Sequence, residues 1–177
     1  MTCSVFIGET EFHDQIYGTR FKQKLNQVGT FQFIAITDML TDTEYDLLSE
    51  NYIVRIYVDG INRFEGYITK VTESNDKCSL EVEGLSLAGI FTTRSTRTPV
   101  ILRGGVDSKM VTASQIVQQA VFRFGGFADD GSTGFRIDAD DGSTMFFYKF
   151  ESQSILNHIV NAAKISGYDW RVYIGDS

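Results

Sequence analysis

The chain has 177 residues, of which 42% are hydrophobic and 13% aromatic, and its formal net charge is −7. This composition supports a packed core and argues against an intrinsically disordered chain. The acidic balance disfavours non-specific nucleic-acid binding, which needs a basic face, but suits a passage through which DNA slides without adhering. Two cysteines, Cys3 and Cys78, are too few for a disulfide framework and indicate folding in a reducing cytosol. The N-terminus lacks a signal-peptide pattern, and no apolar stretch approaches the roughly 20 residues of a membrane helix.

The first 50 residues are expected to form strands followed by a short helix. Alternating apolar and polar residues predict strands over 4–8, 18–26 and 29–37, with a hairpin between the last two. Thr41 precedes Glu44 by three residues, which is the spacing of a capping box, so a short helix is expected over 41–49.

The segment from 52 to 85 gives the clearest signal, an antiparallel meander of three strands. The expected strands cover 52–58, 64–72 and 79–85. Asp59-Gly60 joins the first two, where a two-residue hairpin needs positive φ at both central positions. In the third strand Glu81 and Glu83 share the wet face, so we interpret them as solvated charges rather than as the paired acids of a glycosidase.

A further strand is expected after the meander. The apolar segment 85–93 is broken by Gly89, and a strand over 96–102 ends at Gly104-Gly105. Together with the earlier strands and the single short helix, this predicts a closed or nearly closed antiparallel barrel over residues 1–105.

The periodicity becomes helical in the last part of the chain. One amphipathic helix is expected over 112–124, where Thr112 and Gln115 form a capping box. A second is expected over 154–166, and the glycine at 167 suits a left-handed cap.

Two strands accompany these helices, over 144–150 and 168–174. The second has a large apolar face and stops at a turn, so we expect the native chain to continue into a further sheet. Residues 106–177 are therefore expected to begin a second domain that is cut short at its C-terminus. The predicted fold class is α+β, mostly β: an antiparallel barrel with a short helix, followed by a smaller α+β unit with two amphipathic helices.

One short repeat offers a candidate metal site. The sequence DDGST occurs at 129–133 and again at 140–144. Around the second copy Asp138, Asp140 and Asp141 precede Gly142, and oxygen ligands around a glycine turn are what calcium prefers. The spacing departs from the EF-hand loop, because the glycine comes one place early and a lysine stands at the last ligand position. We therefore interpret the repeat as two Asp-Gly turns, with calcium at the three aspartates as the alternative.

The sequence shows no catalytic motif. His13 and His158 are the only histidines, neither has a Cys or His neighbour at metal-ligand spacing, and His158 is expected on the more polar side of its helix. A nucleophile–histidine pair assembled by folding stays open, but no nucleophile elbow, P-loop or zinc motif is present. We predict no catalytic residue and no cofactor. Four cations fit either a basic stripe or a charged outer face equally well: Arg20, Lys22, Lys24 and Lys70.

Two patterns carry a resemblance to a known family. The hairpin IYVDGINRFEGYITKVT presents Asp59, Gly60, Phe64, Gly66 and Ile68, and the strand after it ends at Gly84 before the broken apolar segment 85–91. Further on, a helix over 114–124 and a strand precede a helix that ends in Gly167, Tyr168, Trp170, Arg171 and Val172. This order, over about residues 15–175, resembles phage tail baseplate-hub proteins, which include the late control protein D group and the base of type VI secretion spikes.

The resemblance implies an architectural function. Such proteins form a ring, typically a trimer, that joins the tail tube to the spike or tip, and their tube-like barrels surround the DNA passage. It implies a virion tail protein, made in the host cytoplasm, without membrane insertion. Its partners would be further copies of itself, the tail tube, the spike, other baseplate proteins, and DNA that passes without specific binding. Exposed strand edges would then serve assembly.

Two other functions stay open from the sequence. A carbohydrate- or receptor-binding β module of a tail tip would use exposed aromatic rings as stacking platforms, and the candidates are Tyr52, Tyr57, Tyr67 and Trp170. Core or cross-strand packing explains these rings better. A tail-associated hydrolase would need a catalytic set that the residue pattern does not supply.

Overall fold

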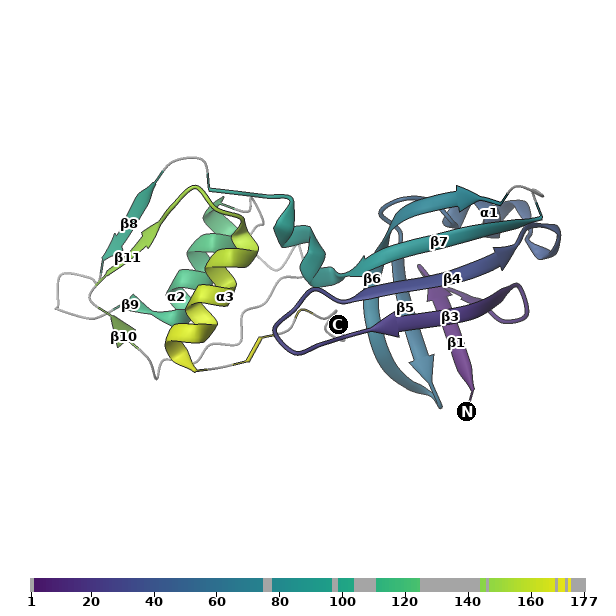
Figure 1. The fold of residues 1–177 in the computed structure, drawn as a ribbon, viewed down its shortest axis with the longest axis horizontal. Coiled ribbons are helices and arrows are strands. Elements are labelled where there is room, and N and C mark those ends of the chain that lie inside the picture. Colours follow the sequence, from purple (N-terminus) through teal and green to yellow (C-terminus); the bar gives the residue numbers. More distant parts are fainter. Residues whose placement is uncertain are drawn as a thin grey trace. The chain divides into compact units, whose positions relative to one another are not determined.

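The computed structural model describes residues 2–74, 78–96, 99–103, 111–124, 144–145, 147–167, 169–170 and 172. The chain divides into two compact units, residues 1–89 and 90–177 (Figure 1). The division falls at Gly89, before the boundary near residue 105 that the change in periodicity indicates.

The first unit is a single antiparallel sheet. Its described strands are β1 (Cys3–Ile7), β2 (Thr10–Phe12), β3 (Ile16–Lys22), β4 (Thr30–Ile36), β5 (Ile53–Val58), β6 (Ile61–Glu73) and β7 (Ser79–Ser86). The seven strands lie in the order β2-β1-β5-β6-β7-β4-β3. The sheet curls into a half-barrel (Figure 1), which confirms a mostly β, barrel-like fold. It does not close within the described residues, because β2 and β3 stand at its two edges.

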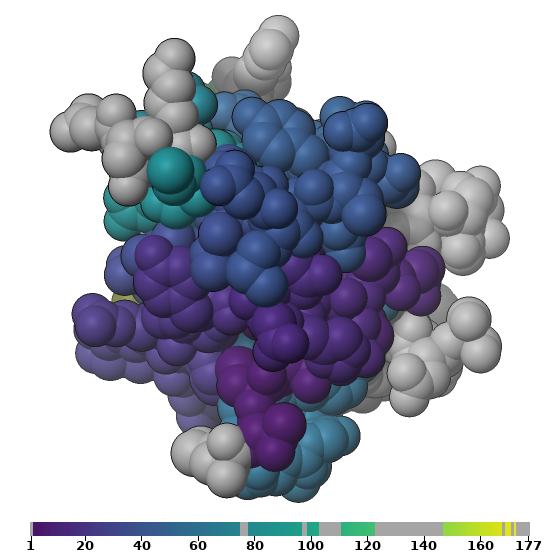
Figure 2. Space-filling model, turned by 90° about the vertical axis from the view of Figure 1, so that its right-hand side faces the viewer, coloured from purple at the N-terminus to yellow at the C-terminus, as the bar shows by residue number. Residues whose placement is uncertain are grey.

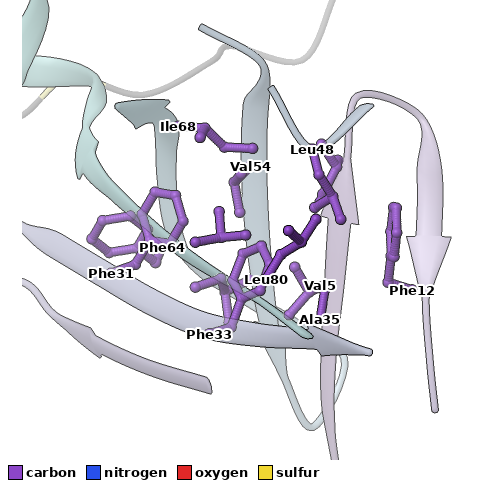
Figure 3. Packing of buried hydrophobic residues seen from close by; sticks show 13 residues of the cluster. Val5, Phe12, Phe31, Phe33, Ala35, Leu48, Val54, Phe64, Ile68 and Leu80 are labelled. Atoms are coloured by element: carbon purple, nitrogen blue, oxygen red, sulfur yellow. The ribbon is translucent and has the colours of Figure 1, made fainter. Parts of the chain in front are cut away.

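The concave face of this sheet holds the first core. Alternation along each strand turns one set of side chains inward, and Figure 3 shows them meeting between the strands. Phe31 packs against Phe33 and Phe64, with ring centroids 5.9 and 5.6 Å apart. Gly84 lies under the Phe31 ring, where a Cβ atom would overlap the ring. The buried cluster comprises Val5, Ile7, Phe12, Phe31, Phe33, Ala35, Leu48, Val54, Ile56, Phe64, Ile68, Leu80 and Val82.

Two local predictions in this unit are confirmed. The β5–β6 turn has φ of 51° at Asp59 and 76° at Gly60, as the two-residue hairpin requires. The helix α1 (Asp42–Leu47) follows a 3-10 turn, η1 (Thr37–Met39), and begins with the predicted capping box. There the Glu44 N–H donates to Thr41 Oγ1 at 3.3 Å, and the Thr41 N–H donates to the Glu44 carboxylate at 2.8 Å.

The second unit packs helices against short strand pairs. A 3-10 segment, η2 (Leu87–Thr92), spans the boundary, and the unit contains β8 (Val100–Arg103), β9 (Val111–Thr112), α2 (Ala113–Gln118), the π-helical η3 (Gln119–Phe124), β10 (Thr144–Met145), β11 (Phe147–Phe150) and α3 (Ile155–Ser166). The strand β8 pairs with β11, and β9 pairs with β10. The strand expected over 96–102 therefore forms, as β8, but belongs to this unit and not to the barrel.

The capping signals predicted for the helices of this unit are present, but the helix expected over 112–124 is α-helical only to Gln118 and continues as the π-helical η3. The capping box of Thr112 and Gln115 is present, and Gly167 closes α3 with a φ of 73°. The second core is the buried cluster of Phe91, Val111, Ile116, Ala120, Val121, Tyr148, Phe150, Ile155, Ile159 and Ala162. Most of the expected strand 168–174 lies outside the described residues.

Candidate functional site

The strand β3 is the longer of the two edges of the curled sheet. It pairs with β4 on one side, and no other strand of the described residues pairs with it. A free edge presents N–H and C=O groups that can pair with a strand of another chain. Tyr17 and Phe21 on β3 are 50% and 37% exposed. Since the opposite edge, β2, has only three residues, β3 is the stronger candidate for contact with another chain.

The β3 edge carries features that limit indiscriminate pairing. The register with β4 shifts between Tyr17 and Arg20, and Gly18 within this bulge has a φ of 66°. Exposed Arg20 and Lys22 follow the bulge. Bulges and charged side chains are what natural edge strands use against aggregation. The edge is therefore protected against non-specific association, while no other described strand pairs with its backbone.

The convex face of the sheet is charged and solvated. A row of side chains crosses four strands, because Arg20 pairs with Gln32, Gln32 with Glu83, and Glu83 with Lys70. The Lys70 ammonium lies 3.5 Å from the Glu83 carboxylate, and Glu81 on the same face is exposed. A shallow depression of about 350 Å³ lies along this row. The depression is open to solvent, and its lining mixes charged side chains with Phe21 and Leu85, so it lacks the enclosure of a ligand pocket.

The second unit buries a histidine that the sequence places on a polar face. His158 of α3 is 1% exposed, so the expectation that it lies on the more polar side of the helix is wrong. Its Nδ1 lies 3.0 Å from the Tyr148 hydroxyl, and its Nε2 lies 3.2 Å from the Glu151 carbonyl oxygen and 3.3 Å from Thr96 Oγ1. Burial lowers the pKa of His158, and the Glu151 backbone carbonyl and carboxylate oppose that effect.

The geometry around His158 fixes its tautomer. A carbonyl oxygen only accepts hydrogen bonds, so Nε2 carries the proton that it donates to Glu151. In the neutral ring Nδ1 then accepts from the Tyr148 hydroxyl. Thr96 Oγ1 donates to the same carbonyl. Because the protonated nitrogen faces Thr96, and Thr96 is itself 1% exposed, His158 is not placed to act as a base toward this hydroxyl.

The remaining candidate residues do not gather into a chemical site. His13 is exposed, with Nε2 3.5 Å from the Glu11 carboxylate, and both cysteines are exposed and lie outside any disulfide bond. Within the part of the chain that the structure describes, no group of three or more His, Cys, Asp or Glu side chains forms a metal site. The candidate calcium ligands Asp138, Asp140 and Asp141 lie outside the described residues. No helix among the described residues is long and apolar enough to cross a membrane.

The candidate stacking aromatics are mostly engaged in packing. The Tyr57 ring contacts Phe6 on the neighbouring strand at a centroid distance of 5.2 Å. Tyr67 is partly buried, which raises the pKa of its hydroxyl, and Trp170 packs against the second core. Tyr52 is the most exposed of the four, at 39%. These rings therefore serve mainly in packing, and their positions do not favour stacking on a sugar.

The comparisons with known proteins give a clear result for the fold only. No family model and no curated protein matches the sequence. A 43 kDa tail protein of the prophage MuSo2 from Shewanella oneidensis is similar over 93% of this chain and 49% of its own, with a TM-score of 0.58 and 12% identity. The prophage tail protein gp18 from Listeria monocytogenes EGD-e is similar over 93% of this chain and 46% of its own, with a TM-score of 0.55 and 9% identity.

A secretion-system protein shows the same similarity. The E. coli c3393 protein, a component of the type VI secretion system described as similar in structure to the bacteriophage T4 tail proteins gp27 and gp5, matches 90% of this chain and 42% of its own. The TM-score is 0.52 and the identity 12%. The chain thus spans about half or less of the length of the structures it matches. It has the fold of these prophage tail and secretion-system proteins, and the resemblance to baseplate-hub proteins is confirmed as a likeness of fold.

Proposed function

We propose that this protein is a structural component of a phage or prophage tail, and that it forms part of the baseplate hub. The observation that carries the proposal is the fold similarity over 90% or more of the chain to tail proteins from unrelated bacteria and to a type VI secretion component. A common fold across such divergent sequences supports a common architectural use, although a fold alone does not dictate function.

Several copies would associate into a ring, a trimer in the full-length protein, between the tail tube and the spike or tip. The free β3 edge supports this role, since sheet edges join chains through main-chain hydrogen bonds. The ring would surround the path of the DNA. A net charge of −7 supports passage without adhesion, because phosphates and acidic walls repel each other. The protein would be made in the host cytoplasm as a late product and end in the virion tail.

We propose no catalytic role for the chain. The nucleophile–histidine pair that folding assembles, Thr96 and His158, is buried, and its hydrogen bonds hold the histidine proton on the side of the threonine. This arrangement supports a structural function for both side chains.

The proposal is tested by locating the protein in particles. We expect mass spectrometry of purified virions to detect the chain, and gold-labelled antibodies to mark the tail end distal to the capsid. Deletion of the gene should leave filled heads without complete tails. Intact, infectious tails in the deletion strain, or particles without the chain, would contradict the proposal.

A further inference from the structure

Two adjacent segments of the first unit carry opposite charge. Residues 15–37 contain three cations and no Asp or Glu, whereas residues 38–52 contain five acids and no Lys or Arg. We name the cations Arg20, Lys22 and Lys24 the basic end. Glu44 is engaged in the capping box of α1, and we name the other four acids, Asp38, Asp42, Asp46 and Glu50, the acidic end.

The two clusters lie at opposite ends of the same strand. Lys22 pairs with Thr30, the first residue of β4, whereas the acidic end begins two residues after Ile36, the last residue of β4. A seven-residue strand spans about 20 Å, which exceeds the screening length of about 8 Å at physiological salt. The clusters therefore do not neutralise each other within one molecule. Figure 2 looks onto the end where the residues around α1 (blue) lie at the surface.

Both clusters are exposed to solvent. None of their seven side chains forms an ion pair with another described residue, and all seven residues are exposed. Each cluster also presents apolar side chains. Met39 and Tyr45 at the acidic end are 47% and 48% exposed, and Leu25 at the basic end is 63% exposed. Apolar and aromatic contacts with charges around them are the composition of a protein–protein contact.

We infer that the acidic end of one copy binds the basic end of a second copy of this chain. The inference rests on the proposed function, because it names the contact through which neighbouring copies associate. The two surfaces differ, so the contact is heterologous and can continue from copy to copy until a ring closes, whereas an isologous contact stops at a dimer. The basic end also continues the free β3 edge, so charge attraction would orient the copy that reaches this edge.

Charge reversal tests the contact directly. One variant carries Asp46→Lys and Glu50→Lys, which leaves the capping box intact and places a cation near the C-terminus of α1, where it is tolerated. The second carries Lys22→Glu and Lys24→Glu. The control, Glu81→Lys with Glu151→Lys, shifts the net charge as much as the first variant but alters neither cluster. Sedimentation velocity of the full chain, over a range of concentrations and salt, measures self-association, and circular dichroism checks folding.

We expect the unaltered chain and the control to associate at low salt and to dissociate at about 0.5 M salt, where the screening length falls to about 4 Å and the charge attraction between the two ends is strongly weakened. Each reversed variant alone should associate about tenfold or more weakly, because like charges then face each other. An equimolar mixture of the two variants should recover association, since each reversed surface then meets its opposite. This recovery also shows that both variants are folded.

Three results would overturn the inference: an unaltered chain that stays monomeric at low salt, reversed variants that associate as the unaltered chain does, or a mixture that recovers nothing. A basic tail protein that binds the acidic end while the chain itself stays monomeric would assign the surface to that partner instead. None of these results removes the protein from virions. Conversely, absence from virions would defeat the proposed function and leave a measured contact between copies standing.

Discussion

The two units of this chain build their cores in different ways. The first core is a cluster of apolar side chains on one face of a single curled sheet. The charged side chains of this unit lie on the convex face and at the strand ends. The second core is built by helices and short strand pairs instead of one large sheet. It encloses His158 together with Tyr148 and Thr96. An apolar core tolerates changes of surface charge, whereas a core with a titratable ring couples its stability to pH. The first unit, which carries the candidate assembly surface, is thus the one whose core stability should depend little on changes of surface charge.

Removal of one core ring from each unit should have the largest effect. Phe64 and Phe150 are 1% and 0% exposed, and truncation of such a ring to alanine costs about 3–5 kcal/mol. Phe64→Ala should destabilise the first unit and Phe150→Ala the second. Hydrogen exchange followed by mass spectrometry measures both, through peptides from β5–β7 and from β11–α3. Equal loss of protection in both units from either substitution would show that they unfold as one body, and the comparison between two cores would fail.

A glycine in the first sheet should matter almost as much. A Cβ atom at Gly84 would overlap the Phe31 ring and the Tyr67 carbonyl, so Gly84→Ala forces the neighbouring strand and ring apart and should cost about 3 kcal/mol. Gly8→Ala is the matched control, because nothing lies within 4 Å of its Cβ position and the only penalty is the positive φ of 60°, about 1 kcal/mol. Chemical denaturation measures the difference. If both substitutions lowered the free energy of unfolding equally, the close contact with the Phe31 ring would not be the reason for a glycine at position 84.

Local patterns predict the first unit better than the second. The Asp-Gly turn and the capping box of Thr41 depend on residues near in sequence, and both are found where predicted, whereas the strand expected over 18–26 runs from Ile16 to Lys22. The pairing of β8 with β11 joins segments more than 40 residues apart, so no local pattern reveals that β8 leaves the barrel. His158 was missed for a different reason. It shares the buried face of α3 with Ile155, Ile159 and Ala162, at regular helical spacing. A polar side chain is nevertheless expected to face solvent, because the sequence does not show which residues across the core will form hydrogen bonds with it.

The sequence pattern of charged residues also predicts little of the candidate assembly surface. The separation of cations and acids is visible along the sequence, but only the register of β3 and β4 shows that the clusters lie at opposite ends of one hairpin. The exposed edge likewise depends on the strand order, because β3 would have a second partner in a closed barrel.

The smallest expected effect is the pH dependence of the second core. The unfolded chain has the ordinary histidine pKa of about 6.5, whereas burial lowers the pKa of His158 in the folded chain. The unfolded state therefore binds more protons below that value, so stability is full above about pH 6.5 and is lost as pH falls toward the folded pKa. Protonation would put a hydrogen on Nδ1, and the Tyr148 hydroxyl would have to turn from donor to acceptor.

This dependence should reside in one residue and one unit. His158→Gln keeps a polar side chain that does not titrate, so the loss of protection in β11–α3 peptides between pH 7 and pH 5, after correction for intrinsic exchange rates, should largely disappear. His13→Gln is the control, because it removes an exposed histidine of the first unit and leaves the second core intact. The first unit should keep its protection over the same range, since its buried cluster is apolar. A pH dependence that survives His158→Gln, or that appears equally in β5–β7 peptides, would mean that the surface carboxylates and not the buried ring set the acid stability of the chain.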